Sequence, residues 1–69
     1  MAKYRLYDRP TDGTTGQDCG VFALDKLPQR IRTAIASDPD ASDWTLPALS
    51  GGDDGEPLDD LDIVITLCN

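Results

Sequence analysis

Carboxylates are the side chains in this sequence whose spacing comes closest to a known chemistry. In Asp38-Pro39-Asp40-Ala41-Ser42-Asp43 they recur at the interval that opens a calcium-binding loop. Such a loop also needs glycine at its sixth position and an acid at its twelfth, where this chain has Asp43 and Leu49. The acids between residues 53 and 62 lack that spacing too. We therefore expect no metal ion and no other cofactor, and we interpret these carboxylates as solvated charges.

Cysteine chemistry is the second candidate. The chain has two cysteines and no histidine, so a four-ligand zinc site would need carboxylates or a second chain. Cys19 lies in Gln17-Asp18-Cys19-Gly20-Val21-Phe22, which resembles the nucleophile segment of the SUMO-protease-like cysteine peptidases. The resemblance implies Cys19 as nucleophile and Gln17 as a neighbour of the oxyanion site. Those peptidases also use a histidine base that this chain lacks, so we expect no enzymatic activity and interpret Cys19 as a small strand residue.

Net charge is the strongest feature of the composition. Thirteen acidic residues stand against six basic ones, for a net charge of −7. All six basic residues precede Thr33, and nine acids follow it. A surface of this sign repels phosphate, which argues against direct binding to DNA, RNA or anionic lipid. It favours a basic protein surface as partner, a cation, or charge that serves solubility alone.

Trp44 admits two interpretations. A tryptophan in so small a domain usually closes the core, because its large apolar surface is seldom left exposed. Here it also stands between an acidic cluster and an apolar pair, Leu46-Pro47. In an interface rimmed by Asp40 and Asp43 it would serve as an aromatic anchor.

Two N-terminal segments are expected to be strands. Lys3–Asp8 is rich in aromatic residues and alternates, which places Tyr4 and Leu6 toward the core. Cys19–Leu24 is short and largely apolar, as in a central strand.

The middle of the chain predicts one helix. Asp25 is expected to be its N-cap, and apolar residues from Leu27 to Ile35 recur at helical spacing. Asp38-Pro39 is expected to end the helix after about three turns.

The C-terminal part is expected to begin with an irregular acidic segment over 38–60 and to end with a strand. The residues from Leu61 to Cys68 alternate strictly between two faces. The fold class predicted is α+β: one domain over 1–69, in the order β-β-α-β, with one helix packed on a three-stranded sheet. The order of the strands stays open. If the second and third strands pair antiparallel, Cys19 lies directly across from Cys68. If they run parallel, the two cysteines lie at opposite ends of the sheet.

No targeting or membrane segment is expected. The N-terminal residues hold no apolar run behind a basic stretch, so a signal peptide is not predicted. The longest apolar run is Ile63-Val64-Ile65, far below the roughly 18 residues of a membrane span. These features favour a cytoplasmic protein.

The function favoured by these observations is that of a small acidic inhibitor or decoy on the basic surface of a nucleic-acid-handling protein, such as a nuclease or CRISPR effector. Small inhibitors carried by phages and mobile elements, including anti-CRISPR proteins, often have a similar size and charge. One alternative is an accessory soluble domain of an Asp-rich or halophilic proteome; another is a thiol or metal protein using Cys19 and Cys68. A homodimer through the exposed edge of the first or last strand is compatible with each. The residues expected to bind the partner are Asp38, Asp40, Asp43, Trp44, Asp53, Asp54, Glu56, Asp59 and Asp60.

Overall fold

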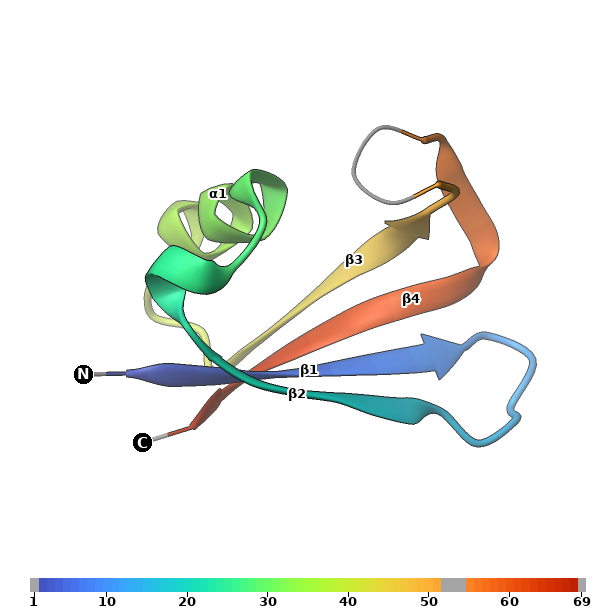
Figure 1. The fold of residues 1–69 in the computed structure, drawn as a ribbon, viewed down its shortest axis with the longest axis horizontal. Coiled ribbons are helices and arrows are strands. Elements are labelled where there is room, and N and C mark those ends of the chain that lie inside the picture. Colours follow the sequence, from blue (N-terminus) through green and yellow to red (C-terminus); the bar gives the residue numbers. More distant parts are fainter. Residues whose placement is uncertain (1, 52–54, 69) are drawn as a thin grey trace.

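The fold is a four-stranded antiparallel sheet with one helix on one face, shown in Figure 1. The computed structural model describes residues 2–51 and 55–68. The order of strands across the sheet is β2-β1-β4-β3. The elements are β1 Lys3–Pro10, β2 Gln17–Ala23, the short 3-10 turn η1 Leu24–Lys26, α1 Gln29–Ser37, β3 Asp43–Leu49 and β4 Pro57–Cys68.

The expectation of three strands is wrong, because the segment assigned to irregular structure contains β3. Trp44 and Ala48 are buried, and Leu46 packs against the core from the same strand. This period of two was obscured by Pro47, which argues against a central strand. The strand forms because β3 lies at the edge of the sheet, where a proline is tolerated.

Element boundaries also differ from the sequence-based expectation: β1 ends at Pro10, and β2 spans Gln17–Ala23 at the edge of the sheet rather than at its centre. The C-terminal strand is confirmed, but it begins at Pro57. The helix begins at Gln29, with Pro28 at the N-cap position and no side-chain cap. Asp25 lies in η1, so its assignment as N-cap is wrong. The reason is Pro28, whose extended ψ of 153° separates the 3-10 turn from the helix.

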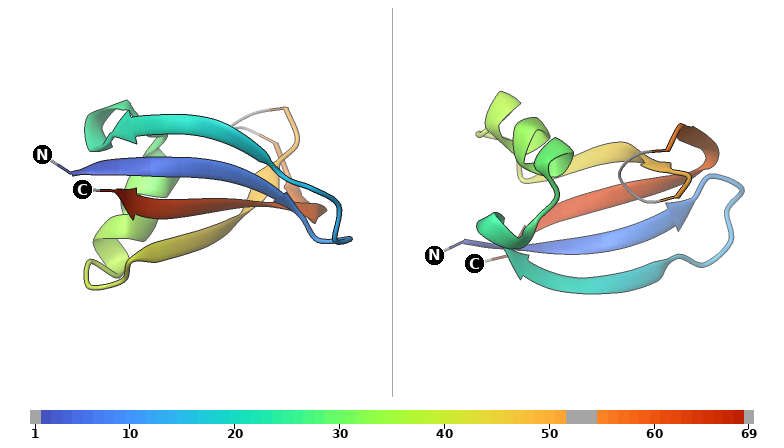
Figure 2. Two further views of the ribbon diagram at one scale, coloured as in Figure 1. Left: turned by 90° about the horizontal axis from the view of Figure 1, so that it is seen from below. Right: turned by 45° about the horizontal axis from the view of Figure 1, so that its top comes forward.

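The core lies between the helix and one end of the sheet. Ile65 of β4 is fully buried beneath Ile31 and its neighbours, and the rings of Tyr4 and Trp44 meet edge to face at 6.0 Å. Figure 2 shows that the helix covers only this end of the sheet, whereas the strands extend beyond it. The buried cluster consists of Tyr4, Leu27, Ile31, Ile35, Trp44 and Ile65.

The strand order separates the two cysteines. The strands β2 and β4 both pair antiparallel with β1, so they run parallel to each other with β1 between them. Cys68 is paired with Lys3 at one end of β1, and Cys19 lies in a bulge opposite Leu6 and Tyr7. Both thiols are free.

Candidate acidic interaction surface

One row of paired residues divides the sheet into two ends. Gly20, Leu6, Ile65 and Trp44 lie side by side across the four strands. The helix and both chain termini lie on one side of this row, and the β1–β2 and β3–β4 connections lie on the other (Figure 1). We call the described residues 7–18, 45–51 and 55–64 the hairpin end, and the remaining described residues the helix end.

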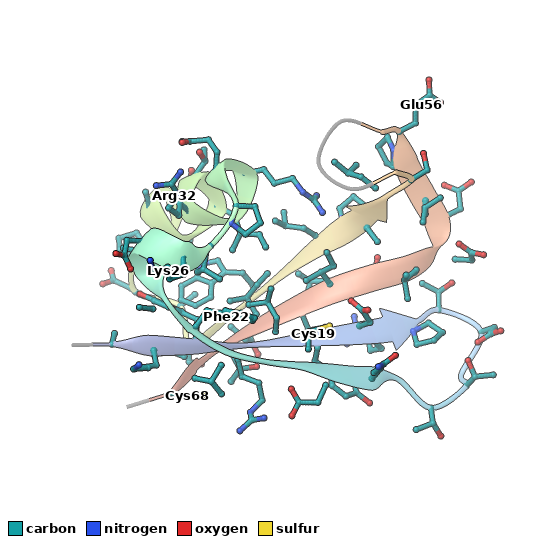
Figure 3. The ribbon with its side chains drawn as sticks, viewed as in Figure 1. Cys19, Phe22, Lys26, Arg32, Glu56 and Cys68 are labelled. Atoms are coloured by element: carbon teal, nitrogen blue, oxygen red, sulfur yellow. The ribbon has the colours of Figure 1, made fainter. Side chains whose placement is uncertain are left out.

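Charge is divided unequally between these two ends. Among the described residues, the hairpin end has seven carboxylates and one basic residue, Arg9. The helix end has five basic and four acidic residues. Figure 3 shows oxygen-bearing side chains along the end of the molecule away from the helix, with Glu56 at the top right beside the start of β4 and with Lys26 and Arg32 near the helix. The seven carboxylates belong to Asp8, Asp12, Asp18, Glu56, Asp59, Asp60 and Asp62.

The acidic residues singled out from the sequence do not form one surface. Asp43 lies opposite Thr66, whereas Asp59 lies seven residues earlier along β4. At about 3.3 Å per residue the two groups are roughly 23 Å apart. Asp38 and Asp40 therefore belong with Asp43 at the helix end.

The other expected binding residues have different positions. Glu56, Asp59 and Asp60 lie at the hairpin end and are exposed. Asp53 and Asp54 lie outside the described residues. Trp44 is 8% exposed and belongs to the core. Its Nε1–H donates to the backbone oxygen of Asp38 over 3.1 Å, so the polar edge of the indole is also occupied.

The N-terminal hairpin contributes carboxylates that were not expected in the site. Asp8, Asp12 and Asp18 stand in the part of the sequence that holds all six basic residues. The antiparallel pairing of β1 with β4 places them on the same end as Asp59 and Asp60. The matching alternation of the first and last strands is the sequence signal that points toward this pairing.

Backbone hydrogen bonds hold the two hairpins together. The N–H of Thr11 donates to the carbonyl of Asp60 over 3.1 Å, and its Oγ1 donates to the carbonyl of Asp59 over 3.2 Å. These bonds fix the β1–β2 turn against the start of β4. The two carboxylates of β4 therefore project from a braced segment of backbone.

Five of the seven carboxylates have no described ion-pair partner, whereas Asp18 pairs with Arg5 from the helix end. The N–H and Oγ1 of Thr14 donate to the Asp12 carboxylate over 3.0 and 2.7 Å, which lowers the pKa of Asp12. Asp62 pairs with Arg9 over 3.7 Å. No described lysine or arginine lies within ion-pair distance of the side chains of Glu56, Asp59 and Asp60.

The environment of Cys19 does not activate its thiol. Partial desolvation and the neighbouring Asp8 carboxylate raise the pKa of Cys19, whereas a nucleophilic cysteine needs a lowered one.

A shallow groove of about 500 Å³ lies at the helix end, lined by Ala2, Tyr4, Leu24, Asp25 and Arg32.

Over residues 2–51 and 55–68, no group of three or more Cys, Asp or Glu side chains is placed to hold a metal ion. No helix in the same ranges has the length and apolarity needed to cross a membrane.

Comparison with known proteins finds no match among family models, curated proteins or solved structures. The hairpin end is therefore the candidate site on charge and geometry alone.

Proposed function

We propose that this protein is a small acidic inhibitor or decoy that uses its hairpin end to occupy the basic surface of a nucleic-acid-handling protein. The observation that supports this proposal is the concentration of seven described carboxylates at one end of the molecule, of which only Asp18 and Asp62 have an arginine as ion-pair partner. A field of one sign at one end orients an approaching basic partner, which evenly spread charge does not do.

The backbone supports this role because it holds the carboxylates at fixed spacing. Asp60 and Asp62 project from one face of β4 at a constant spacing, as phosphates do along a nucleic-acid strand, whereas Asp59 projects from the opposite face because successive strand side chains alternate. Aspartate has a short side chain, so the position of its charge follows the backbone closely. The Thr11 hydrogen bonds described above restrain this strand further.

The partner class follows from the sign and form of the charge. A nuclease or CRISPR effector presents a basic groove that accepts phosphate, and this groove is what the hairpin end would occupy. The protein itself would bind no nucleic acid. We place its action in the cytoplasm, where Cys19 and Cys68 remain reduced. The proposal is one of binding and involves no catalysis by this chain.

A pair of matched variants tests the site. Glu56→Gln/Asp59→Asn/Asp60→Asn removes three charges from the hairpin end, and Asp38→Asn/Asp40→Asn/Asp43→Asn removes three from the helix end. We expect the hairpin variant to bind a captured nuclease or CRISPR effector about tenfold more weakly, because three rim charges at about 0.5 kcal/mol each amount to one decade. The helix-end variant should bind within about twofold of the unmodified protein.

Affinity and inhibition are measured at low and at molar salt, with nucleic acid as competitor. Binding should weaken steeply with salt and should be displaced by duplex DNA. Equal losses in the two variants, or affinity insensitive to salt, would refute the assignment. If no basic protein is bound and the melting temperature rises strongly in molar salt, the acidity serves hydration in a high-salt proteome instead.

A further inference from the structure

The sheet has two edge strands, and they differ in how well they are protected. β1 and β4 are central, so the edges expected from the sequence at the first and last strands are wrong. The edges are β2 and β3. An unprotected edge presents unpaired N–H and C=O groups to any other strand.

The β3 edge is blocked halfway along its length. The N–H of Leu67 donates to the carbonyl of Ser42 over 3.0 Å. Because hydrogen-bonded and non-hydrogen-bonded pairs alternate in an antiparallel ladder, Thr45 and Pro47 direct their backbone groups outward. Pro47 has no N–H to offer, and its carbonyl already accepts a 2.8 Å hydrogen bond from Nη1 of Arg30. A further strand cannot pair along this edge without displacing Arg30.

The β2 edge carries no such protection. The hydrogen bond from Thr11 to Asp60 shows that the odd-numbered residues of β1 direct their backbone groups toward β4. The even-numbered residues of β1 therefore bond to β2, where their partners are Gly20 and Phe22. Val21 and Ala23 then direct their N–H and C=O groups outward. Neither residue has a described hydrogen-bond partner on that side.

Exposed apolar side chains gather at this same edge. Val21 is 42% exposed and Leu24 is 43% exposed, and they are the two large apolar side chains most open to solvent among the described residues. Val21 belongs to β2, and Leu24 follows it directly. Figure 2 shows β2 along the free side of the sheet, away from β3.

We propose that β2 is a dimerisation edge that pairs antiparallel with β2 of a second copy of this chain. In this arrangement Val21 lies opposite Ala23 of the second copy, and the two-fold axis passes between the two Phe22 residues. Each of the two Val21–Ala23 pairs forms two backbone hydrogen bonds, so that four bonds join the two sheets into one. Leu24 then lies level with Gly20 of the second copy, where the absence of a side chain leaves space for it.

Charge complementarity argues for a second copy as the occupant. In the antiparallel arrangement each acidic hairpin end lies beside the cation-richer helix end of the other copy. The η1 turn of the second copy, which carries Lys26, then follows the paired segment on the side of Asp18, whose carboxylate pairs with Arg5 of its own chain. A parallel arrangement would place the two acidic ends together and cost free energy through like-charge repulsion.

The dimer does not depend on the proposed function, and it would direct the two hairpin ends away from each other. Because the paired segment is short, we expect an equilibrium that responds to concentration rather than a permanent dimer. Sedimentation equilibrium of the full chain, from micromolar to about 1 mM, measures it.

The decisive variant is Ala23→Pro. Ala23 already has φ of −71°, which proline adopts, and the substitution removes one outward N–H from each copy. Val21→Lys adds a charge at the same edge, and Thr45→Lys is the matched control on the β3 edge. We expect the unmodified protein and Thr45→Lys to reach dimer mass, and both β2 variants to remain at monomer mass with unchanged circular dichroism.

Two outcomes would overturn the proposal. One is monomer mass for the unmodified protein over the whole concentration range. The other is dimerisation of a folded Val21→Lys variant as strong as that of Thr45→Lys. Val21→Lys keeps the proposal falsifiable if Ala23→Pro fails to fold.

Discussion

Trp44 shows how one side chain of this protein joins several elements. Its ring meets Tyr4 of β1 edge to face, and its Nε1–H reaches the backbone oxygen of Asp38 just after the helix. The indole therefore joins β1, β3 and the end of α1. Composition and neighbours left two roles for this residue open, core closure and interface anchor. Its orientation depends on β3, which the sequence did not predict.

Trp44→Phe tests the core role. The substitution removes the hydrogen bond to Asp38 and part of the packed volume, so we expect the free energy of unfolding to fall by about 2 kcal/mol. Urea denaturation followed by circular dichroism measures this change. The folded variant should bind a basic partner as tightly as the unmodified protein. Unchanged stability together with lost binding would identify Trp44 as an anchor instead.

At the scale of elements, local patterns predicted what local interactions determine. The alternation from Leu61 to Cys68 predicted β4, and the helical spacing from Leu27 to Ile35 predicted most of α1. Non-local pairing was out of reach. β3 is a strand because its edge position tolerates Pro47, and that position follows from the pairing of β4 with the distant β1 on its other side. The order of the strands depends on similarly distant pairings.

The β1–β2 hairpin gives a sharp prediction about its turn. A Cβ on Gly16 would collide with the backbone oxygen of Asp8 and lie 2.7 Å from the ring of Tyr7. A Cβ on Gly13 meets open space, although its φ of +89° is unfavourable for alanine. Gly16→Ala should therefore lower the free energy of unfolding by about 2 kcal/mol, and Gly13→Ala by about 1 kcal/mol. The melting temperature of the Gly16→Ala variant should accordingly be the lower of the two. Equal melting temperatures would contradict this packing.

At the scale of the whole molecule, charge is separated along the fold rather than along the sequence. Along the sequence, all six basic residues precede Thr33 and nine acids follow it. Folding moves Asp8, Asp12 and Asp18 to the end that holds Glu56 and Asp59, and it moves the acids that follow the helix to the other end. Glu56, Asp59 and Asp60 were therefore predictable from residue type. The grouping of the site was not, because antiparallel pairing decides which charges lie together.

The electrostatic potential at each backbone amide tests this separation most directly. Cationic and anionic nitroxide cosolutes of equal size enhance amide proton relaxation in proportion to the local potential, and their ratio is read from NMR spectra residue by residue. We predict the strongest excess of cation over residues 7–18 and 55–63, and a near-neutral ratio over residues 24–37. A uniform ratio along the chain, or a maximum beside Asp38 and Asp40, would contradict an acidic hairpin end.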